Sequence, residues 1–184
     1  MTSLLNIIVG GFLAFCGGAA VAYLTFRLNR DKSQTEHLRL KLEELYLATD
    51  AFEKSVSGNM IGYLPVIDGK ITWNQMLEIQ IDKGGEIPFG GRGTMEMLIN
   101  IYFPDLVGPF ERMVAKLESF NFLVNLMRAE YSETGTLSRD TWNERITSDI
   151  AEYSDAATTL RKSIVEAARP LSGLDMKNWG TLDH

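Results

Sequence analysis

Apolar side chains recur at helical spacing through most of the chain beyond residue 37. Two stretches place them at alternating steps of three and four residues, and a third does so nearly as regularly, which keeps them on one face of a helix. No comparable run alternates apolar and polar residues as a strand would, so the pattern predicts an all-α domain. The positions are Leu38, Leu42, Leu45, Thr49, Phe52 and Val56; Phe110, Met113, Leu117, Phe120, Val124, Met127 and Tyr131; and Trp142, Ile146, Ile150, Tyr153, Ala157, Leu160, Ile164 and Ala167.

Capping residues, glycines and prolines predict where the first helices begin and end. The first helix of the domain continues from the apolar N-terminal segment and ends near Gly58. The sequence Thr72-Trp73-Asn74-Gln75 has the form of a capping box, which predicts a helix over 73–83. A further short helix over 94–103 must end there, because Pro104 lacks a backbone donor.

The same signals define two longer helices. Pro109 suits the first turn of a helix that runs to about Ser132. The residues 141–144 have capping-box form, and the helix that they open ends before Pro170. Three long helices with apolar stripes predict an antiparallel bundle, with the two short helices as an insertion.

The N-terminal segment predicts a transmembrane anchor. Residues 1–26 contain no Lys, Arg, Asp or Glu. A helix over 4–26 is about 34 Å long, enough to cross a hydrocarbon core of about 30 Å. A cleaved signal peptide would use the small residues 20–22 as its cleavage site, but its start would be basic, and residues 1–6 are not. We therefore expect an uncleaved single-pass anchor.

Charge is distributed unevenly in the sequence that follows this segment, and its distribution predicts the orientation of the chain in the membrane. Residues 27–41 carry a local charge of +3, whereas the chain as a whole carries -6. The positive-inside rule places the C-terminal domain in the cytoplasm and the N-terminus outside a bacterial inner membrane. The acidic remainder argues against nucleic-acid binding, and the basic side chains favour contact with anionic membrane lipid. The basic side chains are Arg27, Arg30, Lys32, Arg39 and Lys41.

Small residues recur every four positions within the predicted span, at Gly10, Ala14, Gly18 and Ala22. Such a face lets a second transmembrane helix approach closely, so we expect packing against another span, from a second copy or from a partner. The alternative is a monomeric span, since glycine and alanine are common in membrane helices.

The segment 38–56 could instead form a parallel coiled coil between chains. It spans fewer than three heptads, and Leu40 and Leu47 widen its apolar stripe beyond a two-stranded seam. We therefore favour burial within the domain. The predicted organisation is an anchor at 1–26, a polar membrane-proximal stalk at 27–37, a helical bundle at 38–169 and an aperiodic tail at 170–184.

Candidate chemistry is sparse. The segment 68–72, DGKIT, resembles the middle of a calcium-binding loop but lacks the oxygen ligands that open and close one. The segment 90–94, GGRGT, lacks the Gly-Lys-Ser/Thr ending of a phosphate-binding loop. His37 lies near the predicted membrane and His184 is the last residue, so neither fits a catalytic arrangement. The sequence predicts no enzyme activity, cofactor or metal.

Two residues are candidates for docking: Trp179 in the aperiodic tail and Arg92 in the glycine-rich segment.

The leading functional hypothesis is a membrane-tethered, non-enzymatic interaction protein that binds a cytoplasmic partner or its own copies. The alternative is a membrane effector, either an oligomeric pore or a membrane-disrupting toxin or phage-defence component, with a cytoplasmic sensor domain. A third hypothesis is an enzyme subunit that borrows catalytic residues from a partner.

Overall fold

The computed structural model describes the backbone of residues 2–83 and 91–172 and the side chains of Gly18, residues 21–82 and residues 91–171. The chain divides into two compact units, Met1–Leu40 and Lys41–His184, each of which is described by itself. Within the described ranges every regular element is a helix, which confirms the predicted all-α class.

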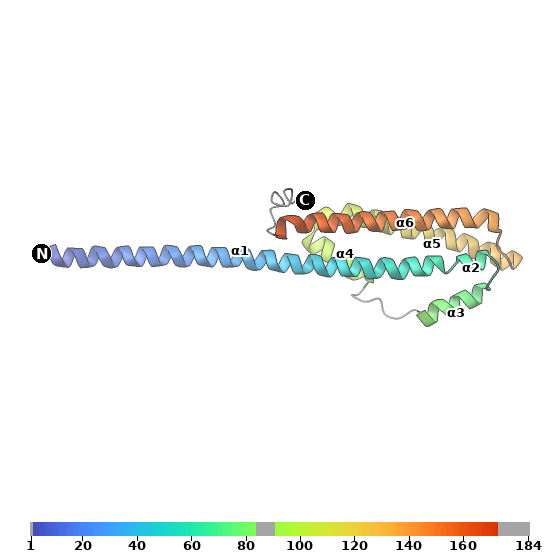
Figure 1. Cartoon of the computed structure of the whole chain (residues 1–184), viewed down its shortest axis with the longest axis horizontal. Coiled ribbons are helices and arrows are strands. Elements are labelled where there is room, and N and C mark those ends of the chain that lie inside the picture. The colour runs from blue at the N-terminus through green and yellow to red at the C-terminus, as the bar shows by residue number, and fades with distance from the viewer. Residues whose placement is uncertain (1, 84–90, 173–184) are drawn as a thin grey trace, which may run out of the picture. The chain divides into compact units, whose positions relative to one another are not determined.

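The elements follow one another as in Figure 1. They are α1 (Thr2–Ile61), α2 (Leu64–Ile67), α3 (Trp73–Lys83), α4 (Gly91–Tyr102), the 3₁₀ turn η2 (Pro104–Leu106), α5 (Val107–Thr134), α6 (Arg139–Ala168) and the 3₁₀ turn η3 (Arg169–Ser172).

The first unit consists of the N-terminal part of α1. Its described side chains, from residue 21 to Leu40, are almost all exposed. Across the portion of the chain that the structure describes, no helix meets the length and apolarity that a membrane crossing requires. The span expected at 4–26 gains no support from that finding and stays a prediction.

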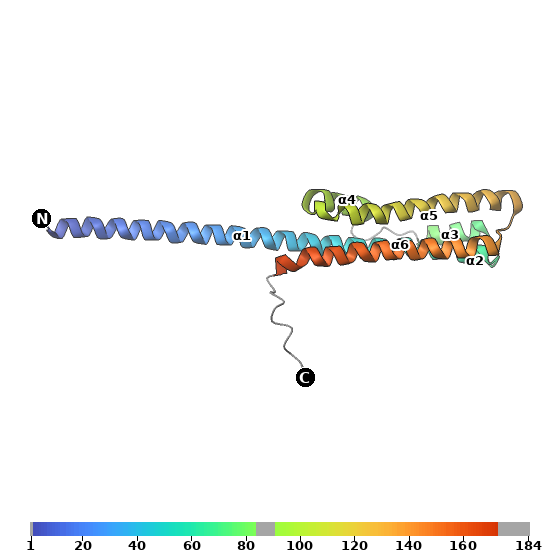
Figure 2. The same cartoon turned by 90° about the horizontal axis from the view of Figure 1, so that it is seen from above.

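The second unit is a bundle formed by α1 from residue 41 onward, α5 and α6. Helix α6 runs antiparallel to both of the others (Figures 1 and 2), as the sequence predicted. The three apolar stripes supply most of its core, and Leu45, Met113 and Tyr153 are fully buried. The segment 38–56 was predicted to be buried within the domain rather than to form a coiled coil between chains. Its side chains at Leu42, Leu45, Thr49 and Phe52 are buried, which agrees with that prediction.

The turn between α5 and α6 depends on one glycine. Gly135 has φ of +74°, and its N–H donates to the carbonyl of Tyr131 at 2.8 Å. This left-handed residue closes the last turn of α5 and reverses the chain. Glu130 then ties the two helices together, because its carboxylate accepts from Trp142 Nε1 at 2.9 Å and from the Ser138 N–H at 3.0 Å.

The predicted start of α3 is confirmed together with its capping box. The Gln75 N–H donates to Thr72 Oγ1 at 3.2 Å, and the Thr72 N–H donates to Gln75 Oε1 at 2.9 Å. Trp73 then anchors α3 to the bundle, with ring centroids 5.7 Å from Tyr63 and 5.8 Å from Tyr131.

Other boundaries differ from those expected. Helix α4 begins at Gly91 rather than near residue 94, and Gly91 is buried with φ of +64°. Helix α6 begins at Arg139, ahead of the expected 141–144 capping box, since the Trp142 N–H already donates to the Ser138 carbonyl. The short helix α2 was not predicted, because four residues are too few to show a period.

Candidate functional site

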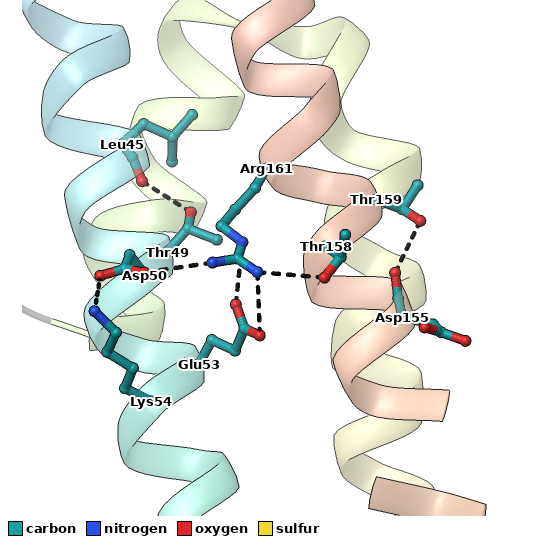
Figure 3. Close-up of polar contacts among 9 residues, drawn as sticks. All are labelled: Leu45, Thr49, Asp50, Glu53, Lys54, Asp155, Thr158, Thr159 and Arg161. Atoms are coloured by element: carbon teal, nitrogen blue, oxygen red, sulfur yellow. Dashed lines mark hydrogen bonds and ion pairs between the residues drawn. The ribbon is translucent and has the colours of Figure 1, made fainter. Parts of the chain in front are cut away.

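A polar cluster joins α1 to α6 beside the apolar core of the bundle (Figure 3). Arg161 of α6 places Nη1 3.4 Å from Asp50 Oδ1 and Nε 3.2 Å from Glu53 Oε2. Its Nη2 also lies 3.3 Å from Thr158 Oγ1, on the preceding turn of α6. We call Asp50, Glu53 and Arg161 the Arg161 cluster.

The positions of these side chains follow from helix geometry. Asp50 and Glu53 are three residues apart, so they lie on one face of α1. That face borders the buried stripe, since Phe52 precedes Glu53 and Thr49 precedes Asp50. Arg161 likewise follows the fully buried Leu160. The apolar packing of the two helices therefore holds the charged groups opposite one another.

A second cation balances the charge. Lys54 Nζ lies 2.7 Å from Asp50 Oδ2, one turn along α1 (Figure 3). With Lys54 included, the group contains two carboxylates and two cations and is neutral overall. The hydrogen bond from Lys54 is the main reason that the pKa of Asp50 lies below its ordinary value, with Arg161 contributing to the same effect.

Glu53 occupies a drier position than Asp50. Its side chain is 12% exposed, against 27% for Asp50. Loss of solvation raises the pKa of Glu53, and Asp50 raises it further, whereas the positive charge of Arg161 acts in the opposite direction. Burial dominates, so the pKa of Glu53 lies above its ordinary value.

Tyr153 lies on α6 two turns before Arg161 and is completely buried. Burial raises the pKa of its hydroxyl, and the negative charge of Glu53 adds to the increase. Among the described residues, the Tyr153 hydroxyl has no hydrogen-bond partner, whereas the buried Glu53 Oε2 faces Arg161 Nε at 3.2 Å. The buried polar atom of this region that stays without a partner is therefore the Tyr153 hydroxyl oxygen.

The chemistry of this arrangement is that of an interhelical connection. Both carboxylates already face cations, which leaves no carboxylate poised as a nucleophile or base. The described residues also contain no group of three His, Cys, Asp or Glu side chains that could hold a metal ion. What the Arg161 cluster can do is fix α6 against α1 in one register.

A shallow hollow adjoins the Arg161 cluster near the end of α6. It has a volume of 460 Å³. Its walls are mixed in charge, with three cationic side chains, one carboxylate, two hydroxyls and one apolar group. They belong to Tyr46, Thr158, Arg161, Lys162, Val165, Glu166 and Arg169.

The residues predicted to pack the span lie partly outside the described side chains. Gly10 and Ala14 fall outside them. Gly18 and Ala22 lie on α1 and are exposed, and a Cβ placed on Gly18 would meet no atom within 4 Å.

The predicted basic group is divided between the two units. Lys41 belongs to the bundle and pairs with Glu44 at 2.7 Å. The other four belong to the first unit, where Arg30 lies 4.0 Å from Asp31. All four are exposed: Arg27, Arg30, Lys32 and Arg39.

Of the two candidate docking residues, only Arg92 is described, and it is not part of the Arg161 cluster. Trp179 lies outside the described residues. Arg92, at the start of α4, is 47% exposed and places Nη1 3.7 Å from Glu118 of α5. In the DGKIT segment, the Asp68 carboxylate pairs with Lys70 at 2.7 Å and with Arg139 at 3.2 Å, so cations already engage the oxygen atoms that a calcium ion would need.

Sequence reasoning missed the Arg161 cluster, although a signal was present. The apolar stripes of α1 and α6 are flanked by charges of opposite sign, at Asp50 and Glu53 on one helix and at Arg161 on the other. Pairing those flanks requires knowing which helices are neighbours, and a single sequence does not supply that.

Comparisons with known protein families, curated proteins and solved structures found no match.

Proposed function

We propose that the chain is a non-enzymatic, single-pass membrane protein that acts through assembly, with its helical bundle in the cytoplasm. One observation carries the proposal: residues 1–26 have no charged side chain, and a local charge of +3 follows at once in residues 27–41. A helical segment of this length and composition is typical of an anchor, and the basic residues behind it favour a cytoplasmic bundle.

The proposed partner surface in the membrane is the small-residue face of the span. Close helix approach is the main source of association where lipid provides no hydrophobic drive. Confinement to one membrane also raises the effective concentration of whatever is tethered alongside. The partner span belongs either to a second copy or to another membrane protein. The residues are Gly10, Ala14, Gly18 and Ala22.

Alkaline carbonate extraction of membranes tests the anchor. The unmodified chain should remain with the membrane pellet. Leu13→Arg should shift it toward the soluble fraction, because an arginine near the middle of a span costs about 2.5–3.5 kcal/mol. Leu28→Arg makes the same chemical change outside the expected span, at a side chain that is 68% exposed. This control variant should remain in the membrane pellet like the unmodified chain. Full extraction of the unmodified chain would refute the anchor.

Association through the span has its own test. The double substitution Gly10→Ile and Gly18→Ile should reduce the assembled fraction in gently extracted membranes, because bulky side chains keep the helix backbones apart. The helical signal of the bundle should not change. Unaltered assembly in this variant would remove the small-residue face from the proposal while leaving the anchor in place.

A further inference from the structure

A groove with a volume of 460 Å³ lies between the C-terminal end of α1 and helix α3. Figure 1 shows that α3 diverges from α1 toward its own C-terminal end, which leaves this space between the two helices. Small residues of α1 line one wall, at Ser55, Gly58 and Gly62, and Ile79 of α3 belongs to the opposite wall. We call this space the α1–α3 groove.

Both walls of the α1–α3 groove carry a large apolar side chain that the fold leaves in solvent. Ile61 of α1 is 52% exposed and Ile79 of α3 is 42% exposed, and both line the groove. The wall formed by α1 is open at Gly58, where an added Cβ would meet no atom within 4 Å. The bundle therefore presents a groove and an apolar ridge, Ile79, next to each other on one surface.

We propose that the α1–α3 groove is the contact between the bundles of two copies of this chain, with Ile79 of each copy seated in the groove of the other. A surface that presents a ridge beside the groove that fits it can pair with itself about a two-fold axis. The wall from Ser55 to Gly62 extends about 10 Å along α1, which leaves room for a side chain from a second copy. The mutual contact removes exposed isoleucines of both copies from water.

Charges beside the groove favour a second copy as the partner. Lys54 is the first residue of α1 that lines the groove, and its side chain is 76% exposed. Asp82 is exposed and lies three residues beyond Ile79, on the same face of α3. Entry of Ile79 therefore brings Asp82 toward a groove edge that carries the opposite charge. The Lys54 ammonium group has three donors and can keep its bond to Asp50 at 2.7 Å.

The inference rests on the proposed function and deepens it, because it names a contact through which anchored copies assemble outside the membrane. The groove involves only a few side chains of each copy, whereas stable interfaces bury about 800 Å² per partner. Tethering in one membrane raises the effective concentration of the bundles, so a small contact can form there. We expect the contact in membranes and its loss in dilute detergent extracts.

Disulfide cross-linking in membranes tests the contact with two tagged forms of the full chain. Each form carries Cys16→Ala and one new cysteine, so no disulfide can form within a chain. Co-expressed Ser55→Cys and Ile79→Cys should give a mixed dimer in a yield several-fold above that of Ser55→Cys with Ile101→Cys. Ile101 of α4 is the matched control, because it is also an exposed isoleucine, at 63%, and does not line the groove.

Two further substitutions distinguish the groove contact from random collision in the membrane. Gly58→Leu should lower the yield of the mixed dimer several-fold, because the leucine side chain occupies the groove. Gly108→Leu is its matched control and should keep the yield, since Gly108 is likewise an exposed helical glycine whose added Cβ meets no atom within 4 Å. Asp82→Lys should also lower the yield, because it places a cation opposite Lys54.

Three results would overturn the proposal. The first is a yield at the level of the Ile101→Cys control, as expected if the groove is empty or holds a small apolar molecule. The second is cross-linking of Ile79→Cys to a protein of another mass in place of the second copy. The third is a yield that Gly58→Leu or Asp82→Lys leaves unchanged.

These failures are distinguishable from failure of the proposed function. Control-level cross-linking of a chain that stays in the membrane pellet would remove the groove contact and leave the anchor in place. Full carbonate extraction of a chain that still gives the mixed dimer would refute the anchor and leave the groove contact in place.

Discussion

Replacing Arg161 with leucine should destabilise the bundle far more than loss of a surface arginine. The substitution keeps an aliphatic side chain but leaves Glu53, only 12% exposed, facing no guanidinium. Removing one partner of a fully buried ion pair costs about 3–5 kcal/mol, whereas exposed pairs contribute about 0.2–1 kcal/mol. Arg161 itself is 28% exposed, so we expect a loss of about 2 kcal/mol, between these limits.

Thermal unfolding of the full chain in detergent, followed through the fluorescence of the buried Trp73 and Trp142, measures this loss. For a unit of this size, about 2 kcal/mol corresponds to a fall in Tm of about 4–8 °C. Arg139→Leu is the matched control. Its side chain is 70% exposed and pairs with Asp68 at 3.2 Å, and its loss should leave Tm nearly unchanged.

The double variant Arg161→Leu with Glu53→Leu distinguishes the stability that depends on the charged pair from the stability that depends on apolar packing. Replacing both members of a buried pair with apolar groups is often neutral, so the double variant should recover most of the lost stability. The loss in Arg161→Leu should also shrink between pH 7 and pH 5, because without the guanidinium the raised pKa of Glu53 rises further. Equal Tm values for Arg161→Leu and Arg139→Leu, or additive losses in the double variant, would refute the reasoning.

Three other substitutions test the local structure of the bundle. Gly135→Ala should cost about 1–2 kcal/mol in urea unfolding, since φ of +74° is unfavourable for a residue with a Cβ. Thr72→Ala should cost about 1 kcal/mol through loss of the cap, seen as faster amide exchange confined to α3; unchanged exchange there would contradict the capping role. Glu130→Leu should cost about 1.5 kcal/mol, because Trp142 Nε1 and a backbone N–H lose a charged acceptor; an unaltered unfolding midpoint would contradict this.

Much of the bundle could be predicted because its helices are long. Over twenty or more residues, the apolar positions of α5 and α6 repeat often enough to fix both the helix and its buried face. Local signals worked where a side chain bonds its own backbone, as in the cap formed by Thr72 and Gln75. They failed at the start of α6, where Glu130, eight residues earlier in the chain, binds the Ser138 N–H.

The Arg161 cluster could not be predicted for a related reason. Asp50 and Arg161 are 111 residues apart in the sequence, and only the packing of α6 against α1 brings them together. Glu53 shows the same limit, because an ordinary glutamate beside Phe52 gives no sign that its carboxylate will be buried. Residue type and spacing identify faces, whereas burial of a charge depends on which faces meet.

Native mass spectrometry of the full-length chain, gently extracted from membranes in detergent, tests the central claim of an anchored assembly protein most directly. The account predicts a membrane-derived complex heavier than the 20.6 kDa chain. Its mass would be a multiple of the chain or the sum of the chain and a membrane partner, and it would fall in the Gly10→Ile, Gly18→Ile variant. A bare 20.6 kDa monomer under conditions that preserve other membrane complexes would contradict it.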